Sequence, residues 1–257
     1  MASNSNGLFV WYEHLANEAA AAISFYEEVV GWKTQPFAEG SGYVMWLSAQ
    51  GPLGGVMKLP EQAAQKGAKP HWMGNVLVAD VDATAALAQK LGGKLHKKPE
   101  DIPTVGRFAV IEDPQGAAIT VFKPQGAMTP HDSSQEGEFC WSELLTSDSA
   151  AAFKFYSEIF GWKLLEELAM GEMGTYLIYG VGDKRLGGMM TTPKGAPMPP
   201  MWLYYTETGD LDAALARAKK RGAKVMNGPM DVPGGGRVVQ LTDPQGAGFA
   251  LHQSPKK

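Results

Sequence analysis

Two short segments, residues 9–15 and 139–145, alternate between apolar and polar side chains, which is typical of a half-buried β-strand. After each segment the apolar positions recur three and four residues apart, and this spacing predicts a helix with one buried face. The residues at helical spacing are Ala22, Ile23, Tyr26, Val29 and Val30 in the first half, and Ala152, Phe153, Tyr156, Ile159 and Phe160 in the second. Each first strand is therefore expected to lead into an amphipathic helix.

The expected ends of these two helices follow from polar residues and glycines. Asn17 and Ser147 stand where helix N-caps belong, and each is followed by an acid that suits the positive end of the helix dipole. Gly31 and Gly161 follow the last apolar position, where a left-handed residue commonly ends a helix. The sequence thus predicts where each first helix starts and stops.

The rest of the first half predicts strands around one more helix. Three short strands fit the span up to about residue 59, and a further strand is expected near 72–79. A second helix near 82–91 and three more strands follow, with Asp113–Gly116 forming a type I turn before the last one. The second half follows the same order, so we expect four βαβββ modules in the chain.

Four sequence blocks recur in the same order about 130 residues apart. The recurring blocks are 9–15 with 139–145, 25–33 with 155–163, 53–57 with 186–190, and 113–117 with 243–247. This period is too long for a solenoid repeat and fits a duplicated domain. We predict a first domain at residues 1–123, a linker rich in Pro, Gly and Ser at 124–137, and a second domain at 138–257.

The repeated blocks resemble the vicinal oxygen chelate superfamily, which contains glyoxalase I, bleomycin-resistance proteins and extradiol dioxygenases. The resemblance rests on the paired βαβββ modules, on Phe-Tyr late in the first helix, on the Gly-Trp after it, and on Asp-Pro-x-Gly before the last strand. It covers nearly the whole chain and implies an α+β fold of two glyoxalase/bleomycin-resistance-like domains with open, cup-shaped mixed sheets. The first strands resemble those of two-domain glyoxalase-related proteins, among them accessory proteins of anthracycline hydroxylation.

Composition narrows the classes of partner. The chain of 257 residues has a formal net charge of −4 and no basic face, which argues against nucleic acid. No apolar run approaches the roughly 18 residues of a membrane span, and no secretory signal is visible. A single cysteine, Cys140, fits a reducing compartment. We therefore expect a cytoplasmic protein.

The resemblance also implies where a metal would be bound. Metal-dependent members place a His in the first strand, a His or Gln early in the fifth strand and a Glu in the last strand. The corresponding residues here are Trp11, Asn75 and Thr120 in the first half, and Trp141, Tyr205 and Ala250 in the second. An indole N–H only donates hydrogen bonds, and a catalytic zinc needs about three His, Cys or carboxylate ligands. We expect no metal cofactor and disfavour a divalent metal.

A duplicated indole and carboxylate stand where the metal ligands are missing. Alternation puts Trp11 and Glu13 on one strand face, and Trp141 and Glu143 on the matching face of the second half. These residues either pack in the core or form a pocket in which Trp stacks on a ligand and Glu holds a donor. In such a pocket burial would raise the pKa of Glu13 and Glu143, so either could act as acid or base.

Each of the other candidates has more than one interpretation. Trp72 and Trp202 open the fifth strands and either fill the core or touch a ligand. Arg107 and Arg237 could pair with Glu13 or Glu143, bind an anionic ligand, or lie on the surface. His252 shares a strand face with Ala250, so it either reaches the second cup or has a structural role.

The leading hypothesis is a protein that binds a small hydrophobic or aromatic molecule in its cups without a catalytic metal. The rival is a lyase or dioxygenase of glyoxalase type that uses a metal or Glu as base, and an accessory protein to a polyketide hydroxylase is a further alternative. The expected partner is a small molecule. A fused pair of domains is expected to be a monomer or a homodimer.

Overall fold

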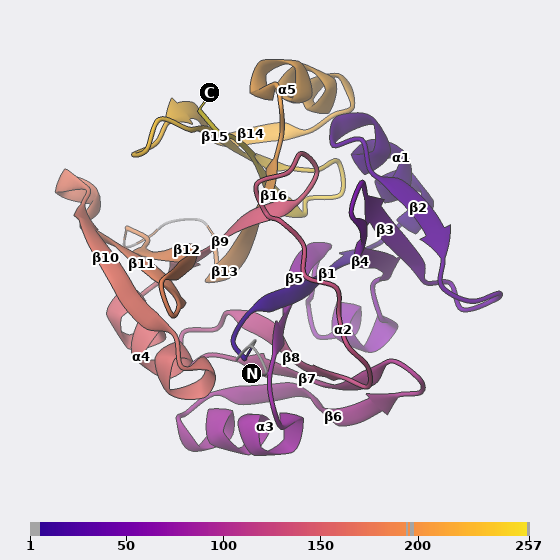
Figure 1. Ribbon diagram of the computed structural model, residues 1–257, viewed down its shortest axis with the longest axis vertical. Helices are drawn as coiled ribbons and strands as arrows, with labels where there is room; N and C mark the ends of the chain where they lie inside the picture. Colours follow the sequence, from indigo (N-terminus) through magenta and orange to yellow (C-terminus); the bar gives the residue numbers. More distant parts are fainter. Residues whose placement is uncertain (1–5, 194, 196–197, 256–257) are drawn as a thin grey trace. The chain divides into compact units, whose positions relative to one another are not determined.

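The computed structural model describes residues 6–193, 195 and 198–255 and confirms the four βαβββ modules (Figure 1). Module 1 comprises β1 (Phe9–Ala16), α1 (Ala19–Val29), β2 (Lys33–Pro36), β3 (Val44–Ser48) and β4 (Gly51–Lys58), followed by the short α2 (Glu61–Gln65). Module 2 comprises β5 (His71–Leu77), α3 (Val81–Lys90), β6 (Lys94–Ile102), β7 (Gly106–Glu112) and β8 (Ala118–Pro124). Module 3 comprises β9 (Phe139–Thr146), α4 (Ser149–Phe160), β10 (Lys163–Ala169), the 3-10 turn η1 (Gly171–Met173), β11 (Thr175–Val181) and β12 (Lys184–Thr191). Module 4 comprises β13 (Met201–Glu207), α5 (Leu211–Lys220), β14 (Lys224–Asp231), β15 (Arg237–Thr242) and β16 (Gly248–Gln253).

The ends of α1 and α4 differ in part from the prediction. The N-caps are Glu18 and Asp148, one residue after the predicted Asn17 and Ser147. Asp148 accepts a hydrogen bond from the Ala151 amide at 3.0 Å. Ser and Asp are almost equally good N-cap residues, so the sequence alone did not decide between Ser147 and Asp148. Gly31 and Gly161 have φ of +88° and +71°, as expected for the left-handed residue after a helix.

Each half of the chain contributes one eight-stranded mixed sheet. The strand orders are β2-β3-β4-β1-β5-β8-β7-β6 and β10-β11-β12-β9-β13-β16-β15-β14. The pairs β1–β4, β5–β8, β9–β12 and β13–β16 are parallel, and the outer pairs are antiparallel. The predicted α+β class with open, cup-like mixed sheets is confirmed. No helix among the described residues is long and apolar enough to cross a membrane.

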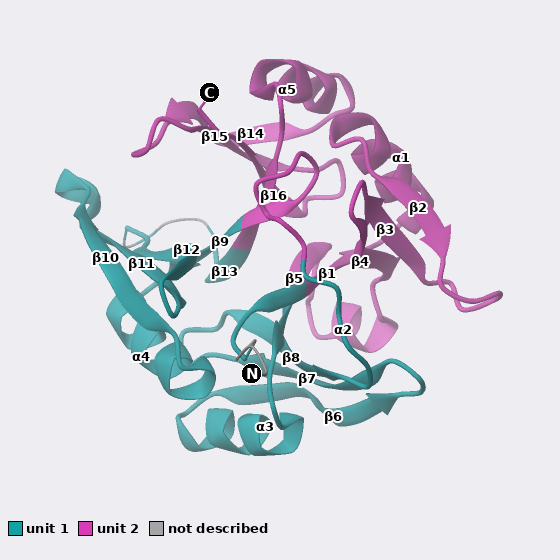
Figure 2. Ribbon diagram, viewed as in Figure 1, with its two compact units in different colours: residues 1–10, 74–130, 141–202 teal, residues 11–73, 131–140, 203–257 magenta. Residues whose placement is uncertain are grey.

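The compact units of the chain do not coincide with its two sheets (Figure 2). Unit 1 comprises residues 1–10, 74–130 and 141–202, which is essentially modules 2 and 3. Unit 2 comprises residues 11–73, 131–140 and 203–257, which is essentially modules 1 and 4. Two modules of the same repeat thus share a sheet, whereas each compact unit combines one module from each repeat. The predicted limits 1–123, 124–137 and 138–257 stay a prediction, and residues 1–5 and 256–257 lie outside the described part.

In unit 2 a chain of buried hydrogen bonds links module 1 to module 4. The indole of Trp72 donates to the hydroxyl of Tyr26 on α1 at 2.8 Å. The Tyr26 hydroxyl donates in turn to Oδ2 of Asp243, in the turn before β16, at 3.2 Å. His14 is fully buried beside this chain, with its Nε2 3.2 Å from the same Asp243 oxygen. The repeated Phe-Tyr and Asp-Pro-Gln-Gly blocks therefore meet, each coming from a different repeat.

Unit 1 contains the reciprocal arrangement. Trp202 donates to the Tyr156 hydroxyl on α4 at 3.2 Å, and Tyr156 donates to Oδ2 of Asp113 at 3.0 Å. The other oxygen of Asp113, Oδ1, accepts the amides of residues 115–117, which fixes the predicted turn. A buried carboxylate is costly unless it is hydrogen-bonded, so the hydroxyl and the amides together make its burial tolerable.

The tyrosine at the centre of each chain can be tested by substitution. We expect Tyr26→Phe and Tyr156→Phe each to lower the free energy of unfolding by about 1–3 kcal/mol, because a buried indole N–H and a buried carboxylate each lose a partner. Urea unfolding of the full chain followed by tryptophan fluorescence measures the change. Stabilities equal to that of the wild type would contradict the proposed role of the hydroxyls.

Candidate functional site

The face of β1 that points away from α1 carries Trp11 and Glu13. His14 lies on the opposite face, where its ring contacts Tyr26 of α1 at a centroid distance of 5.2 Å. Strand alternation therefore turns Trp11 and Glu13 to the side that the helix does not cover, as the sequence predicts. Both side chains are partly exposed.

A tyrosine from the neighbouring hairpin completes this arrangement. Tyr43 lies directly before β3, and its hydroxyl accepts a hydrogen bond from the Trp11 indole N–H at 2.8 Å. The same hydroxyl donates to the Glu13 carboxylate, 2.8 Å from Oε1 and 2.9 Å from Oε2. We call Trp11, Tyr43 and Glu13 the first triad.

Unit 1 contains a second triad of the same residue types. The Trp141 indole on β9 donates to the hydroxyl of Tyr176 on β11 at 2.9 Å. Tyr176 also hydrogen-bonds to Glu143, which is buried on β9. The repeat of an indole, a phenol and a carboxylate in both halves indicates that the combination is retained as a set.

The repeated Gly-Gly pair makes room for these triads. Gly55 and Gly188 stand beside Glu13 and Glu143 in the parallel ladders, and a Cβ on either glycine would overlap the ring of Tyr43 or Tyr176. The glycine before each, at positions 54 and 187, has its Cα against the backbone of β1 or β9, where a side chain would not fit. The Gly-Gly block is therefore explained by close packing.

Sequence reasoning missed both tyrosines, although a signal for them existed. Tyr43 precedes Gly55 by the same twelve residues that separate Tyr176 from Gly188. The flanking sequences differ, so the shared tyrosines do not stand out as a block. Only the strand pairing reveals that each phenol lies over a glycine and reaches the carboxylate.

Burial dominates the electrostatics of the first triad. It raises the pKa of Glu13 to about 7, although the hydrogen bonds from Tyr43 and Trp11 act in the opposite direction. Burial and the charge of Glu13 also raise the pKa of Tyr43 well above its usual range. The same two causes, with Glu143 as the charge, raise the pKa of Tyr176. The phenols therefore stay protonated, and Glu13 can exchange a proton near neutral pH.

The donor set at the family's metal positions does not fit a divalent ion. Trp11 and Trp141 present indole N–H groups that already donate to tyrosines. Asn75 and Thr120 are buried partners in the β5–β8 ladder, and Tyr205 and Ala250 hold the same register in β13–β16. The Tyr205 hydroxyl accepts from Gln240 at 2.6 Å. We therefore derive no chemistry through a metal at these positions.

Four other predicted candidates lie away from the triads. Trp72 and Trp202 are buried and belong to the hydrogen-bond chains of the core, which favours the core-filling interpretation. Arg107 pairs with Asp82 and Asp101 at the surface, with its closest approach of 2.7 Å to Asp82. Arg237 pairs with Asp212 at 2.8 Å. The structure thus supports the surface interpretation for both arginines, and neither contacts Glu13 or Glu143 in the described contacts.

His252 does not join either glutamate of the triads. Its Nδ1 lies 2.5 Å from Oε2 of Glu207 on β13.

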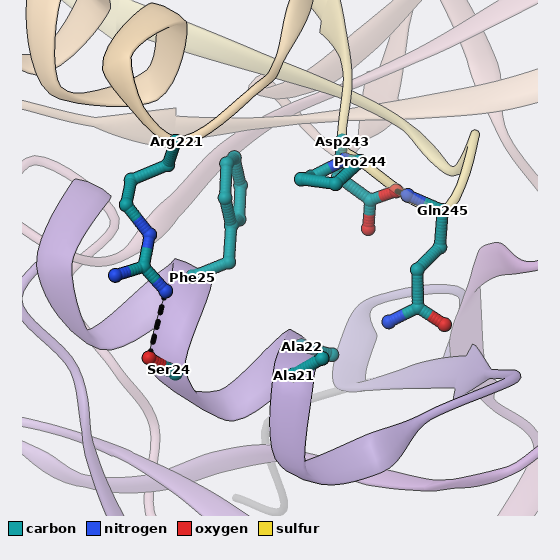
Figure 3. A pocket seen from close by; sticks show the side chains of 8 residues that line it. All are labelled: Ala21, Ala22, Ser24, Phe25, Arg221, Asp243, Pro244 and Gln245. Carbon is teal, nitrogen blue, oxygen red and sulfur yellow. Dashed lines mark hydrogen bonds between the residues drawn. The ribbon is translucent and has the colours of Figure 1, made fainter.

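A separate cavity of about 300 Å³ in unit 2 lies between α1 and the turn that follows β15 (Figure 3). Phe25, Arg221, Pro244 and Gln245 are among its lining residues, and none of the triad residues lines it. The sequence-predicted pairs Trp11 with Glu13 and Trp141 with Glu143 are each joined by a tyrosine in the described structure.

The raised pKa of Glu13 predicts a pH-dependent stability. Between pH 4.5 and about 7 the unfolded chain ionises this carboxyl while the folded chain keeps its proton, so the wild type is progressively destabilised as the pH rises. Glu13→Gln removes this penalty. We expect its stability relative to the wild type to increase across this window by about 1–3 kcal/mol and to level off above it. Urea unfolding at a series of pH values measures the difference.

Tyr43→Phe provides the matched variant for this measurement. Loss of the phenol hydrogen bonds raises the pKa of Glu13 in the folded chain further, so the upper limit of the window moves to higher pH while its lower limit stays at the unfolded value. A stability difference between wild type and Glu13→Gln that does not vary with pH would contradict the assignment.

The chain is similar in sequence to several named proteins. The chain is 30% identical over 244 residues to a Mycobacterium bovis protein named "Putative glyoxylase CFP32", covering 94% of this chain and 92% of that one. It is 28% identical to "Anthracycline biosynthesis protein DnrV" of Streptomyces peucetius, covering 95% and 92%.

A solved structure shows the same fold at lower identity. The Mn(II)-bound glyoxalase from Novosphingobium aromaticivorans matches with a TM-score of 0.64 and 18% identity, over 98% of this chain and 83% of that one. The family model of the Glyoxalase/Bleomycin resistance protein/Dioxygenase superfamily matches twice, at residues 9–121 and 140–251. The chain therefore belongs to the glyoxalase/bleomycin resistance protein/dioxygenase superfamily, with two copies of its domain in tandem.

Proposed function

We propose that this protein binds a small aromatic molecule at its triads, without a catalytic metal at the family's ligand positions. The observation that carries the proposal is the duplicated set of Trp, Tyr and Glu, in which the Trp stands where metal-dependent members place a His. A set that served only to fill space would not need a carboxylate in both copies, because burying a carboxylate is costly.

The hydrogen bonds within the first triad leave particular surfaces for a ligand. The indole N–H of Trp11 and the hydroxyl of Tyr43 are bonded to each other, so these two side chains offer mainly their aromatic faces. The Glu13 oxygens each have a lone pair beyond the bond to Tyr43. A planar ligand that carries a hydroxyl or amine therefore matches this combination of stacking faces and one acceptor.

The name of one relative agrees with such a ligand. DnrV is named an anthracycline biosynthesis protein, and anthracyclines are flat, hydroxylated polycyclic molecules. We extend this to a polyketide-like aromatic ligand and to a role in its sequestration or its delivery to a partner enzyme. A cytoplasmic location and a monomeric or homodimeric state are part of the same proposal.

Binding can be tested with 1,8-dihydroxyanthraquinone as the probe. We expect it to quench tryptophan fluorescence saturably and to raise the melting temperature, because a ligand of the native state stabilises it by mass action. Trp11→Leu and Trp141→Leu remove one stacking face each and should weaken binding about tenfold, which corresponds to about 1.4 kcal/mol.

Arg107→Lys and Arg237→Lys serve as matched controls for this titration. Both arginines pair with surface acids, so these variants should bind the probe as the wild type does. Equal binding by the Trp variants, or a loss in the arginine variants, would contradict ligand binding at the triads.

One observation favours acid–base catalysis as a second candidate function. Glu13 has a pKa of about 7, which suits a general acid or base at neutral pH. This function predicts that chelator-treated protein turns over a 2-oxoaldehyde hemithioacetal. The absorbance of the hemithioacetal measures the turnover. Glu13→Gln should then reduce turnover about 100-fold while probe binding stays within about threefold of the wild type. Turnover that Glu13→Gln leaves unchanged would exclude Glu13 as the base.

A further inference from the structure

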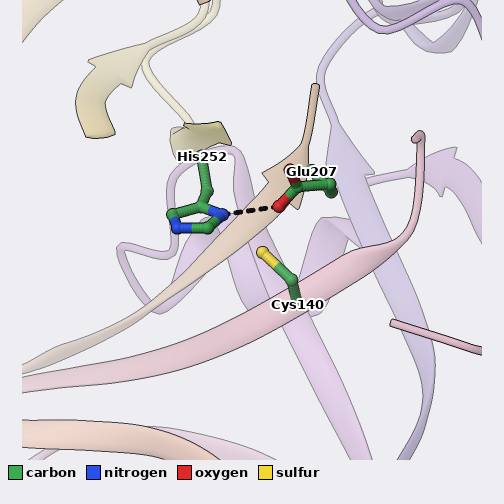
Figure 4. Close-up of side chains that lie close together, drawn as sticks. All are labelled: Cys140, Glu207 and His252. Carbon is green, nitrogen blue, oxygen red and sulfur yellow. Dashed lines mark hydrogen bonds and ion pairs between the residues drawn. The ribbon is translucent and has the colours of Figure 1, made fainter. Parts of the chain in front are cut away.

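Three side chains able to bind a metal meet in unit 2, and none of them belongs to a triad (Figure 4). Cys140 lies on β9, Glu207 on β13 and His252 on β16, and one ligand atom of each lies within 4.8 Å of the others. Cys140 and His252 are partly buried and Glu207 is buried. Figure 4 shows the Cys140 sulfur directed toward the contact between His252 and Glu207.

The sheet places these three residues next to one another. Glu207 and His252 are register partners in the parallel β13–β16 ladder, so their side chains leave the same face. Cys140 comes from β9, which borders β13 on its other side, and its Sγ lies 3.4 Å from the Tyr205 carbonyl oxygen. The cluster therefore spans three adjacent strands, and its positions are fixed by backbone pairing.

The same three positions in the first repeat are apolar. The repeat offset of 130 residues, which relates Phe9 to Phe139 and Asp113 to Asp243, relates the cluster to three other residues. These are Val10, Leu77 and Phe122. The second repeat thus has a thiol, a carboxylate and an imidazole together where the first has a small apolar cluster. A single polar replacement could be incidental. Here three neighbouring apolar residues are replaced, and all three replacements are able to bind a metal.

The carboxylate and the imidazole are already held in place. Oε1 of Glu207 accepts the Ser254 amide at 2.8 Å, and Oε2 lies 2.5 Å from Nδ1 of His252. Burial alone would raise the pKa of Glu207, but the hydrogen bonds from His252 and Ser254 outweigh it and the pKa is lowered. The His252 ring turns its other nitrogen toward Gly236, where a Cβ would lie 2.7 Å from Nε2.

The environment of the Cys140 thiol does not suit nucleophilic chemistry. Burial and the charge of Glu207 raise the pKa of Cys140, so a metal-free thiol keeps its proton. A bound cation reverses this preference, because a coordinating thiol loses its proton to the ion's charge.

We propose that Cys140, Glu207 and His252 form a Zn²⁺ site. Sγ, Oε2 and Nδ1 supply the three protein ligands, and a water completes the tetrahedron. Thiolate, carboxylate and imidazole are the ligands that zinc takes in proteins, at about 2.0–2.3 Å. Entry of the ion replaces the hydrogen bond between His252 and Glu207, and these two atoms move apart to about 3.3 Å, the spacing of tetrahedral ligands.

Cobalt substitution tests the site directly, because Cys140 is the only cysteine in the chain. Titration of chelator-treated full-length protein with Co²⁺ should give a thiolate-to-cobalt charge-transfer band that saturates at one equivalent and disappears when Zn²⁺ is added. Cys140→Ser should abolish the band and weaken Zn²⁺ binding at least about tenfold, measured by competition with a chromophoric chelator. A wild-type protein without the band would overturn the proposal.

Further variants separate metal binding from folding. The triple variant Cys140→Val, Glu207→Leu, His252→Phe carries the residues of the first repeat, so it should fold and show no rise in melting temperature with Zn²⁺. His96→Phe removes an exposed histidine that pairs with Glu112, and it should keep the band and the stoichiometry. Zn²⁺ affinity that is unchanged in Cys140→Ser, or is lost in His96→Phe, would overturn the proposal.

Discussion

The structure depends on two buried hydrogen-bond chains in which an indole donates to a phenol and the phenol donates to a carboxylate. In unit 2 the chain is Trp72, Tyr26 and Asp243, and in unit 1 it is Trp202, Tyr156 and Asp113. Each aspartate has no basic partner of the Lys or Arg type in the described contacts, and burial raises the pKa of Asp113. Its burial is tolerable because backbone amides and the phenol share its charge. Each hydrogen-bond chain therefore positions the first helix of one repeat against the last turn of the other repeat.

The triads use the same three chemical groups on the opposite face of the sheet. In the core the phenol accepts from an indole and donates to a carboxylate, and in the first triad Tyr43 does the same between Trp11 and Glu13. The core chains and the first triad differ in their exposure to solvent. The residues of the two core hydrogen-bond chains are buried, whereas Trp11 and Tyr43 are partly exposed. The same combination of groups serves stability on one face and presents stacking surfaces on the other.

Much of the fold could be predicted from the sequence, because each repeated block marks one local requirement. The alternation in residues 9–15 and the glycines at 31 and 161 located strands and helix ends, and the face of Glu13 was correct. The partners of these elements could not be predicted, because Tyr43, Gly55 and Glu13 meet only through strand pairing. The contact between Tyr26 and Asp243 joins residues 217 positions apart. Likewise, no short motif links Cys140, Glu207 and His252, which come together only when three strands form one sheet.

The exchange of modules between repeats bears on how such a chain could arise. One repeat alone supplies a complete sheet, a tyrosine on its first helix and an aspartate in its last turn. The tyrosine of each repeat donates a hydrogen bond to the aspartate of the other repeat. An ancestor of half this length would therefore satisfy its buried carboxylates only by associating with a second copy. Gene fusion would convert that association into a single polypeptide, and afterwards the two copies would be free to diverge, as the apolar and ligand-bearing versions of one strand cluster have done.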